Sequence, residues 1–197
     1  ATATEDKLYS YEVKAQDADQ DKLTYVLEQA PTGMALDKVT GLLKWTPLND
    51  AVGTQVIQFR VEDGRGGVAR QRFSVTVANV NDNPVISSSP PLEAVEDTLY
   101  TYQVKASDPD PTKDTLKFLL SKPPKGMKID SATGVLTWRP ENSDVGRYPV
   151  AIEVEDGKGG KTTQSYTLVV KNVNDAPKFS STPITKATED QAYQYRA

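Results

Sequence analysis

Residues 33–47 read GMALDKVTGLLKWTP, and residues 126–140 read GMKIDSATGVLTWRP. Glycine, methionine, aspartate, tryptophan and proline stand at the same places in both segments, at an offset of 93 residues. Self-similarity at a fixed period is the signature of tandem repeats, in which each copy is one structural unit. The pattern therefore predicts two successive copies of one module.

Three further blocks repeat in the same order. ATEDKLYSYEVKA at 3–15 returns as AVEDTLYTYQVKA at 94–106 and begins again as ATEDQAYQY at 187–195; VEDGRGG at 61–67 returns at 154–160 as VEDGKGG; and NVNDNP at 79–84 returns at 172–177 as NVNDAP. The first block is offset by 91 residues, and a two-residue insertion after Asp110 explains the difference. We expect repeat 1 at residues 1–84, repeat 2 at 85–177, and the start of an incomplete repeat 3 at 178–197.

Within each copy the apolar residues follow a period of two, as in the segments 9–15, 56–61 and 73–77. This alternation is typical of half-buried antiparallel strands, and clusters of Asp, Gly and Pro mark turns between them. Six or seven short strands per copy predict an all-β chain of two tandem antiparallel two-sheet sandwiches. The segment 188–197 predicts the first strand of a third copy, which we expect to pair with a sheet edge of its own or of another molecule.

The composition excludes several classes of function. The chain has no cysteine and no histidine, which removes disulfides, the usual zinc ligands and a Ser-His-Asp triad. A net charge of −4 argues against nucleic-acid binding, and no apolar run approaches the roughly 18 residues of a membrane span. Paired carboxylates are able to hydrolyse glycosides, but here the acids recur in both copies, which indicates a structural device; we expect no enzyme.

Aromatic residues raise a second possible function. Trp45 and Trp138 occupy equivalent positions and are either sugar-stacking platforms or core residues of two small sandwiches. Tyr9, Tyr11 and their counterparts Tyr100 and Tyr102 are also candidates for stacking, although alternation with polar residues favours the core. A carbohydrate-binding module that is accessory to a polysaccharide-active protein is therefore the alternative function.

Acidic or amide side chains stand at four separated places in each copy: Glu-Asp in the first strand, Asp-x-Asp in the first turn, Asp-Gly before a hairpin, and Asn-x-Asn-Asp at the junction. Since sandwich loops cluster at two ends, one set is expected to converge between the modules. This set comprises Glu5, Asn79, Asn81, Asp82, Asp108, Asp110 and Asp156. Two carboxylates about 4 Å apart repel by roughly 1–4 kcal/mol, depending on the dielectric. Ca²⁺ binds six to eight oxygens and would reverse this repulsion, so the sequence predicts an interdomain calcium site.

These residues also carry a family resemblance. The segments 79–84 and 172–177 resemble the cadherin linker, Asp108-Pro-Asp110 resembles the cadherin Asp-x-Asp motif, and Glu5 resembles the acid of the cadherin first strand. The segments 33–47 and 126–140 are similar to dystroglycan-type cadherin-like and "Putative Ig" repeats of large bacterial surface proteins. The resemblance implies a seven-stranded Ig-like sandwich, an extracellular or cell-surface location, and roles in adhesion or attachment to matrix or polysaccharide.

The chain departs from the cadherin pattern in two places. Asn79 stands where cadherins usually have Asp, and neither Asn49-Asp50 nor Asp144 gives a consistent counterpart of the cadherin Asp-Arg-Glu motif. Calcium affinity is then expected in the weak range of about 10⁻⁴ to 10⁻³ M. Two further sites are expected to be incomplete, because each lacks a neighbouring repeat. They comprise Asp17, Asp19 and Asp63 in repeat 1, and Glu96, Asn172, Asn174 and Asp175 in repeat 2.

The function that best fits these observations is a non-catalytic, calcium-stiffened spacer or adhesion repeat of a large cell-surface or secreted protein. Its expected partners are neighbouring repeats of the same chain, with a polysaccharide or another cell-surface protein as further candidates. We expect no nucleic-acid partner and no membrane insertion in this fragment.

Overall fold

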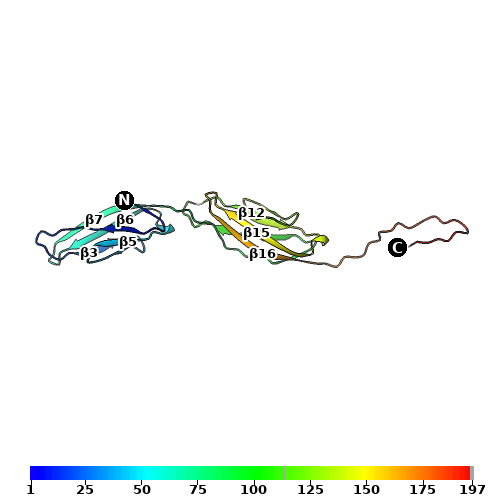
Figure 1. Cartoon of the computed structure of the whole chain (residues 1–197), viewed down its shortest axis with the longest axis horizontal. Helices are drawn as coiled ribbons and strands as arrows, with labels where there is room; N and C mark the ends of the chain where they lie inside the picture. The colour runs from blue at the N-terminus through cyan, green and yellow to red at the C-terminus, as the bar shows by residue number, and fades with distance from the viewer. Residues whose placement is uncertain (113, 196–197) are drawn as a thin grey trace.

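The computed structural model describes residues 1–112 and 114–195, which form two β-sandwich modules joined end to end. A short linker connects β7 of the first module to the second module, and a C-terminal segment continues beyond it (Figure 1). No helix among these described residues is long and apolar enough to cross a membrane.

Module 1 consists of two sheets with the strand orders β1-β7-β6-β3 and β2-β5-β4. Its strands are β1 Thr2–Thr4, β2 Tyr9–Glu12, β3 Thr24–Gln29, β4 Ala35–Leu36, β5 Leu42–Trp45, β6 Gly53–Glu62 and β7 Val68–Ala78, with the 3₁₀ helix η1 Asn49–Ala51 before β6. β1 pairs in parallel with β7, whereas β6 and β7 form a long antiparallel hairpin. The first segment of the chain therefore contributes one strand to each sheet, β1 to the first and β2 to the second.

Module 2 repeats this arrangement, with the sheets β12-β15-β16-β9 and β10-β14-β13 and an added pair β11-β8. Its strands are β8 Val85–Ile86, β9 Glu93–Val95, β10 Tyr100–Gln103, β11 Ala106–Ser107, β12 Lys117–Ser121, β13 Lys128–Ile129, β14 Val135–Trp138, β15 Gly146–Glu155 and β16 Lys161–Lys171, with η2 Asn142–Asp144 before β15. β9 again pairs in parallel with the last strand. The all-β fold class and the duplication predicted from the sequence are confirmed.

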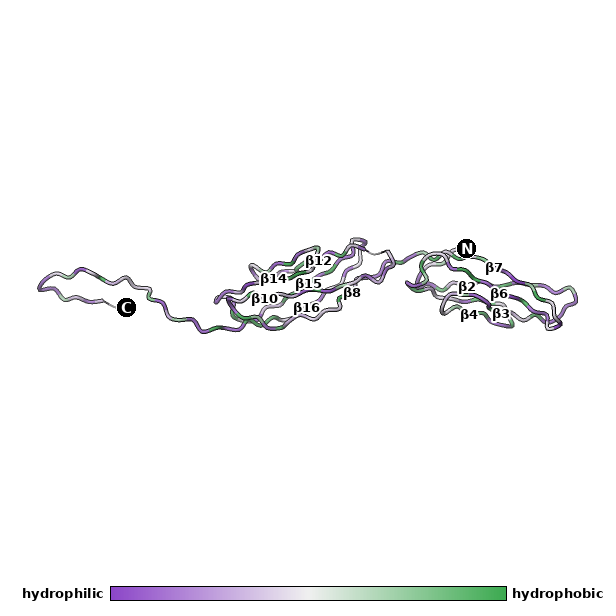
Figure 2. Tube along the Cα trace, turned by 180° about the vertical axis from the view of Figure 1, so that it is seen from behind, coloured by the Kyte–Doolittle hydropathy of each residue, from purple (hydrophilic) through white to green (hydrophobic). Residues whose placement is uncertain are grey.

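The core of each module follows from the alternation of apolar and polar residues. Hydrophobic and hydrophilic residues alternate along strands such as β6 and β15 (Figure 2), and the apolar ones face the space between the two sheets. Each module has its own cluster of buried side chains, with no member shared between them. Each module therefore has a small core of its own, and the contact between the modules depends on the linker and the facing loops.

The two tryptophans occupy the centres of these cores. Trp45 and Trp138 are each 2% exposed, and their indole N–H groups donate to the carbonyl oxygens of Thr32 and Lys125 at 3.1 Å. A buried tryptophan whose N–H is satisfied contributes packing and cannot stack on a sugar. The core interpretation is confirmed, and the stacking role considered for these two residues is wrong.

The Thr-Gly turn before each tryptophan strand needs a glycine. Gly41 has φ +71°, and a Cβ atom there would lie 2.6 Å from the carbonyl oxygen of Val13 and 3.0 Å from the Tyr25 ring. The amide of Val13 donates to the Gly41 carbonyl at 2.9 Å, so the two backbone segments are held together. This close approach fixes the turn against the residue that follows β2, the strand that pairs with β5 in the same sheet.

The strand expected at 188–197 is not formed in residues 188–195, and residues 196–197 lie outside the described part of the chain. In module 2 the equivalent strand β10 pairs with β14, and the printed sequence contains no third copy of that partner. The segment instead folds back on itself: the Tyr193 hydroxyl donates to the Ile184 carbonyl, and Tyr195 contacts Ser181 at 2.6 Å. The same two contacts exist in module 2, from Tyr100 to Pro91 and between Tyr102 and Ser88.

We predict that Gly41→Ala lowers the free energy of unfolding of module 1 by more than about 2 kcal/mol, because a left-handed backbone and a backbone clash are combined. Gly64→Ala is the matched control, since Gly64 has φ +75° with nothing within 4 Å of its Cβ position. It should cost only about 1 kcal/mol. Urea unfolding followed by Trp45 fluorescence in a Trp138→Phe background measures both, and equal losses would contradict the role of the close approach.

Candidate metal centre at the junction between the modules

A buried carboxylate anchors the linker to module 1. The chain passes from β1 to β2 through Glu5 and Asp6, and Asp6 adopts φ +57°, a conformation that Asp tolerates better than most residues. Glu5 is 1% exposed, and its Oε2 accepts a hydrogen bond from the Val80 amide at 2.9 Å. The first acid of the module therefore holds the first residues of the linker at the junction end.

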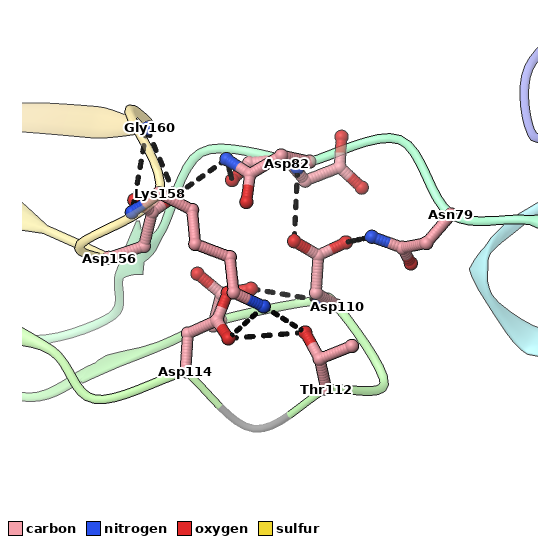
Figure 3. Close-up of polar contacts among 10 residues, drawn as sticks. Asn79, Asp82, Asp110, Thr112, Asp114, Asp156, Lys158 and Gly160 are labelled. Carbon is pink, nitrogen blue, oxygen red and sulfur yellow. Dashed lines mark hydrogen bonds and ion pairs between the residues drawn. The ribbon is translucent and has the colours of Figure 1, made fainter.

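The linker then reaches module 2 through side-chain amides and one backbone amide (Figure 3). Asn79 Nδ2 donates to Asp110 Oδ1 at 3.0 Å, and the Asp82 amide donates to Asp110 Oδ2 at 3.2 Å. Asn81 Nδ2 donates to Asp156 Oδ2 at 2.7 Å. The structure thus brings both halves of the sequence-predicted set together around residues 79–82.

Three carboxylates of module 2 form the acidic centre of this junction. One carboxylate oxygen from each of Asp108, Asp114 and Asp156 lies within 4.8 Å of the other two. The Asp114 side chain is only 4% exposed, and its Oδ2 has no hydrogen-bond partner. Asp108 Oδ2 is likewise buried and unpartnered. Buried carboxylate oxygens without a hydrogen-bond partner are costly unless a cation compensates them, and this cluster of carboxylates fits an oxygen-binding metal such as Ca²⁺.

Asparagine carbonyls add neutral oxygens to this donor set. Asn49 Oδ1 and Asn79 Oδ1 are buried and have no hydrogen-bond partner, although the amide nitrogens of both residues contact carboxylates. Carboxylate and amide oxygens together are the ligands that Ca²⁺ prefers, whereas Zn²⁺ prefers nitrogen and sulfur. The chemistry of the donors therefore matches calcium better than zinc.

The electrostatics of the individual acids differ. Burial raises the pKa of Glu5, with further repulsion from Asp82 and Asp110, against the lowering effect of the Val80 amide. Burial also raises the pKa of Asp108, and the charges of Asp110, Asp114 and Asp156 add to it. Ionisation of Glu5 and Asp108 is therefore less favourable than that of free carboxyl groups.

Asp156 behaves in the opposite way. The Asn81 amide lowers the pKa of Asp156, assisted by the backbone N–H groups of Lys158 and Gly160, which donate at 2.6 and 3.0 Å. The carboxylate is thereby held in its ionised form at the tip of the β15–β16 hairpin. In this ionised form it accepts the Asn81 amide of the linker.

One cation of the chain already contacts this cluster. Lys158 Nζ lies 2.6 Å from Asp114 Oδ1 and 2.9 Å from Thr112 Oγ1 (Figure 3). The hydrogen bond that Lys158 donates to Asp114 and the charges of Asp114, Asp110 and Asp108 raise the pKa of Lys158, so that it remains protonated. Lys158 was not among the residues singled out from the sequence.

Two more contributors were missed by the sequence analysis. Asp114 is the counterpart of Asp21, but the insertion after Asp110 separates it from the Asp-x-Asp motif in copy 2. Asn49 Nδ2 donates to Asp82 Oδ2 at 2.7 Å, and its counterpart Asn142 donates to Asp175 at 2.6 Å. Asn49-Asp50 and Asp144 do not align with each other because the equivalent residues are those that begin η1 and η2, Asn49 and Asn142. The fixed offset of 93 residues relates Asp114, Asn49 and Lys158 to counterparts in the other copy, and it was the signal in the sequence that could have identified them.

The two sites expected to be incomplete have the contacts of a half-site. At the free end of module 1, Asp17 accepts the amide of Asp19 at 2.8 Å, and Asp63 accepts those of Arg65 and Gly67 at 2.7 and 2.9 Å. No linker residue from the described part of the chain contacts them.

At the far end of module 2, Glu96 is 1% exposed and accepts the Val173 amide, as Glu5 accepts that of Val80. Asn172 and Asn174 are exposed, and Asp175 contacts Asn142. Glu96 Oε2 is buried without a partner. This end therefore reproduces the anchor on which a following module would dock.

Comparisons with known proteins place the chain in a family. The profile of the family described as "Putative Ig domain" matches residues 1–78 and 83–171, one match for each module. The chain therefore belongs to this family of Ig-like repeats. No curated protein sequence matches the chain.

Cadherin extracellular domains share the fold. Protocadherin gamma B2 domains 3–6 align over 88% of this chain and 45% of their own, with 18% identity and a TM-score of 0.60. The first two extracellular domains of human protocadherin-24 align over 88% of this chain and 94% of their own, with 19% identity and a TM-score of 0.55. At such identities the likeness establishes the two-module cadherin-like architecture alone.

A family 107 endo-fucoidan hydrolase is also similar, at 22% identity over 88% of this chain. The chain spans only 27% of the length of that enzyme, and the TM-score is 0.42. This match carries no argument about activity or substrate.

We predict that Asp156→Ala loosens the junction, whereas Asp63→Ala does not. Both carboxylates cap the same hairpin turn through the same backbone amides, so each substitution should cost its own module about 1–2 kcal/mol. Only Asp156 also receives the Asn81 amide from the linker. ¹⁵N relaxation should therefore show increased independent tumbling of the modules for Asp156→Ala alone, and equal behaviour of both variants would refute the docking role.

Proposed function

We propose that the chain is a pair of non-catalytic spacer repeats from a cell-surface or secreted protein, in which Ca²⁺ at the junction fixes the angle between neighbouring modules. The observation that carries this proposal is the pair of buried, unpartnered oxygens Asp108 Oδ2 and Asp114 Oδ2 beside the linker. A carboxylate oxygen that has lost water and gained no donor needs a cation to offset its desolvation.

The residues that would hold the ion come from both modules and from the linker. Module 1 offers Glu5 and Asn49, the linker offers Asn79, Asn81 and Asp82, and module 2 offers Asp108, Asp110, Asp114 and Asp156. When bound, Ca²⁺ would supply positive charge that attracts acids which otherwise repel one another. Because the donors belong to different modules, binding energy would be lost whenever the modules move apart.

A mechanical role accounts for how these acids are used. Asp110 and Asp156 each accept a hydrogen bond from a side-chain amide of the linker, and Glu5 accepts one from the linker backbone. The end of module 2 repeats the Glu5 anchor with Glu96, so the geometry can continue from one repeat to the next. An array built in this way would be stiff with calcium and flexible without it.

The setting of the array is part of the same proposal. Ig-like and cadherin-like repeats are typical of extracellular proteins, where millimolar calcium suits sites with dissociation constants of about 10⁻⁴ to 10⁻³ M. Neighbouring repeats are the immediate partners, and the outer faces would present the array to a polysaccharide or to another surface protein. The burial of both tryptophans disfavours the alternative of a dedicated carbohydrate-binding module.

The test is calcium titration by calorimetry, with melting temperature and interdomain motion measured in calcium and in chelator. Calcium should raise the melting temperature of the wild type and slow independent motion of the modules. The double variant Asp108→Asn with Asp114→Asn should weaken binding at least about tenfold, equivalent to about 1.4 kcal/mol. No heat of binding at millimolar calcium and no effect of chelator would sink the proposal.

A matched control is available in module 1. Asp17→Asn with Asp21→Asn changes the same two positions of the repeat and the same charge, but at the free end of module 1, away from the linker. It should leave calcium binding at the junction unchanged. A loss equal to that of the module 2 pair would show that the effect is one of general charge and not of the junction.

A further inference from the structure

We infer that Lys158 is a built-in cation of the junction, whose ammonium group takes up part of the acidic cluster that a divalent ion would otherwise fill. It would hold the junction together when calcium is scarce and keep the calcium affinity low. The second half of this inference rests on the proposed calcium function, whereas the first half concerns the chain without metal.

The position of the ammonium group is the first argument. Lys158 Nζ contacts Asp114 Oδ1 at 2.6 Å and Thr112 Oγ1 at 2.9 Å, and the Thr112 hydroxyl donates to the same carboxylate at 3.1 Å. Asp114 is one of the three acids whose oxygens lie within 4.8 Å of one another. A positive charge there faces the same carboxylates that a metal would bind.

The difference in burial between the two partners is the second argument. The Asp114 side chain is 4% exposed, whereas that of Lys158 is 47% exposed. A buried carboxylate cannot regain water if its partner leaves, so it needs some cation in place. A half-exposed lysine on a flexible stem can move aside into water, so Ca²⁺ can displace it.

Recurrence at equivalent positions is the third argument. In module 1, Arg65 and Asp21 stand where Lys158 and Asp114 stand in module 2, and Arg65 Nε lies 3.0 Å from Asp21 Oδ1. A basic residue two places after the hairpin aspartate therefore faces the same acid in both copies. The pairing is a property of the repeat and not an accident of one surface.

The charges of the cluster show why one ammonium matters. The carboxyl groups around the linker are those of Glu5, Asp82, Asp108, Asp110, Asp114 and Asp156. Among the described residues, Lys158 is the basic side chain that contacts any of them. Removing it should lower the stability of the junction without metal and raise the affinity of the cluster for Ca²⁺. The two changes have opposite signs.

The experiment compares the two-module protein with its Lys158→Gln variant, in chelator and in calcium titrations. In chelator, the variant should show more independent motion of the modules by ¹⁵N relaxation and a lower melting temperature of module 2. In calorimetry with CaCl₂, the variant should bind at least about tenfold more tightly than the wild type, which corresponds to about 1.4 kcal/mol.

Three control variants separate the junction from general charge. Lys128→Gln removes the same charge from an exposed position on β13, and Arg65→Gln removes the equivalent cation at the free end of module 1. Both should match the wild type in calcium binding and in interdomain motion. Lys158→Arg keeps the charge, so it should stay close to the wild type in chelator, and because its planar fork is displaced less readily it should bind calcium no more tightly than the wild type.

The outcomes distinguish this inference from the proposed function. If the wild type binds calcium and Lys158→Gln binds it equally well with unchanged motion in chelator, the inference is overturned and the calcium proposal stands. If neither protein binds calcium, the calcium proposal fails, and the comparison in chelator alone decides: looser modules in Lys158→Gln support the built-in cation, and identical behaviour refutes it. Calcium binding by the variant alone would show that the lysine fully replaces the ion.

Discussion

The crowding of like charge at the junction is the constraint on which the rest of the architecture depends. Each module is a small core that is complete in itself, so nothing in the cores dictates how two modules meet. The meeting is governed by carboxylates that burial has stripped of water, such as Glu5 and Asp110, at 1% and 4% exposure. A buried charge is tolerated only where hydrogen bonds or a cation compensate it, and here the linker is the source of many of those hydrogen bonds.

The chain uses three kinds of compensation in different places. Backbone amides donate hydrogen bonds to Glu5 and Asp156. The side-chain amides of Asn79 and Asn81 donate to Asp110 and Asp156, respectively. An ammonium group forms an ion pair with Asp114. Amides are neutral and leave the net charge unchanged. They therefore satisfy the hydrogen-bonding capacity of the carboxylates without removing the repulsion between them. Asp108 Oδ2 and Asp114 Oδ2 remain without a donor, and they are the positions at which an added cation would gain most.

Much of this organisation could be predicted from the sequence because each motif occurs in both copies of the repeat. Acids that recur in the same order in two copies, at loops that a sandwich gathers at one end, had to be near one another. Asp114 and Lys158 were missed because pairing between side chains of different loops leaves no local pattern, and the insertion after Asp110 disguised the match of Asp114 with Asp21. The strand expected at 188–197 is not formed in the described residues 188–195 for another reason: alternation predicts a strand only where a partner strand is present.

The duplication also separates what every repeat requires from what each junction can vary. The Glu5 and Glu96 anchors and the Asn49 and Asn142 contacts are the same in both copies, so they define how any two repeats would dock. The cation beside the equivalent aspartates Asp21 and Asp114 differs: it is Arg65 in one copy and Lys158 in the other. Arginine holds its charge in a rigid planar fork, whereas lysine presents a compact charge on a flexible stem that a competing ion can displace more readily. Exchange of these two residues at one position of the repeat would let a long array combine permanently neutralised joints with joints that respond to calcium, without any change in the sandwich itself.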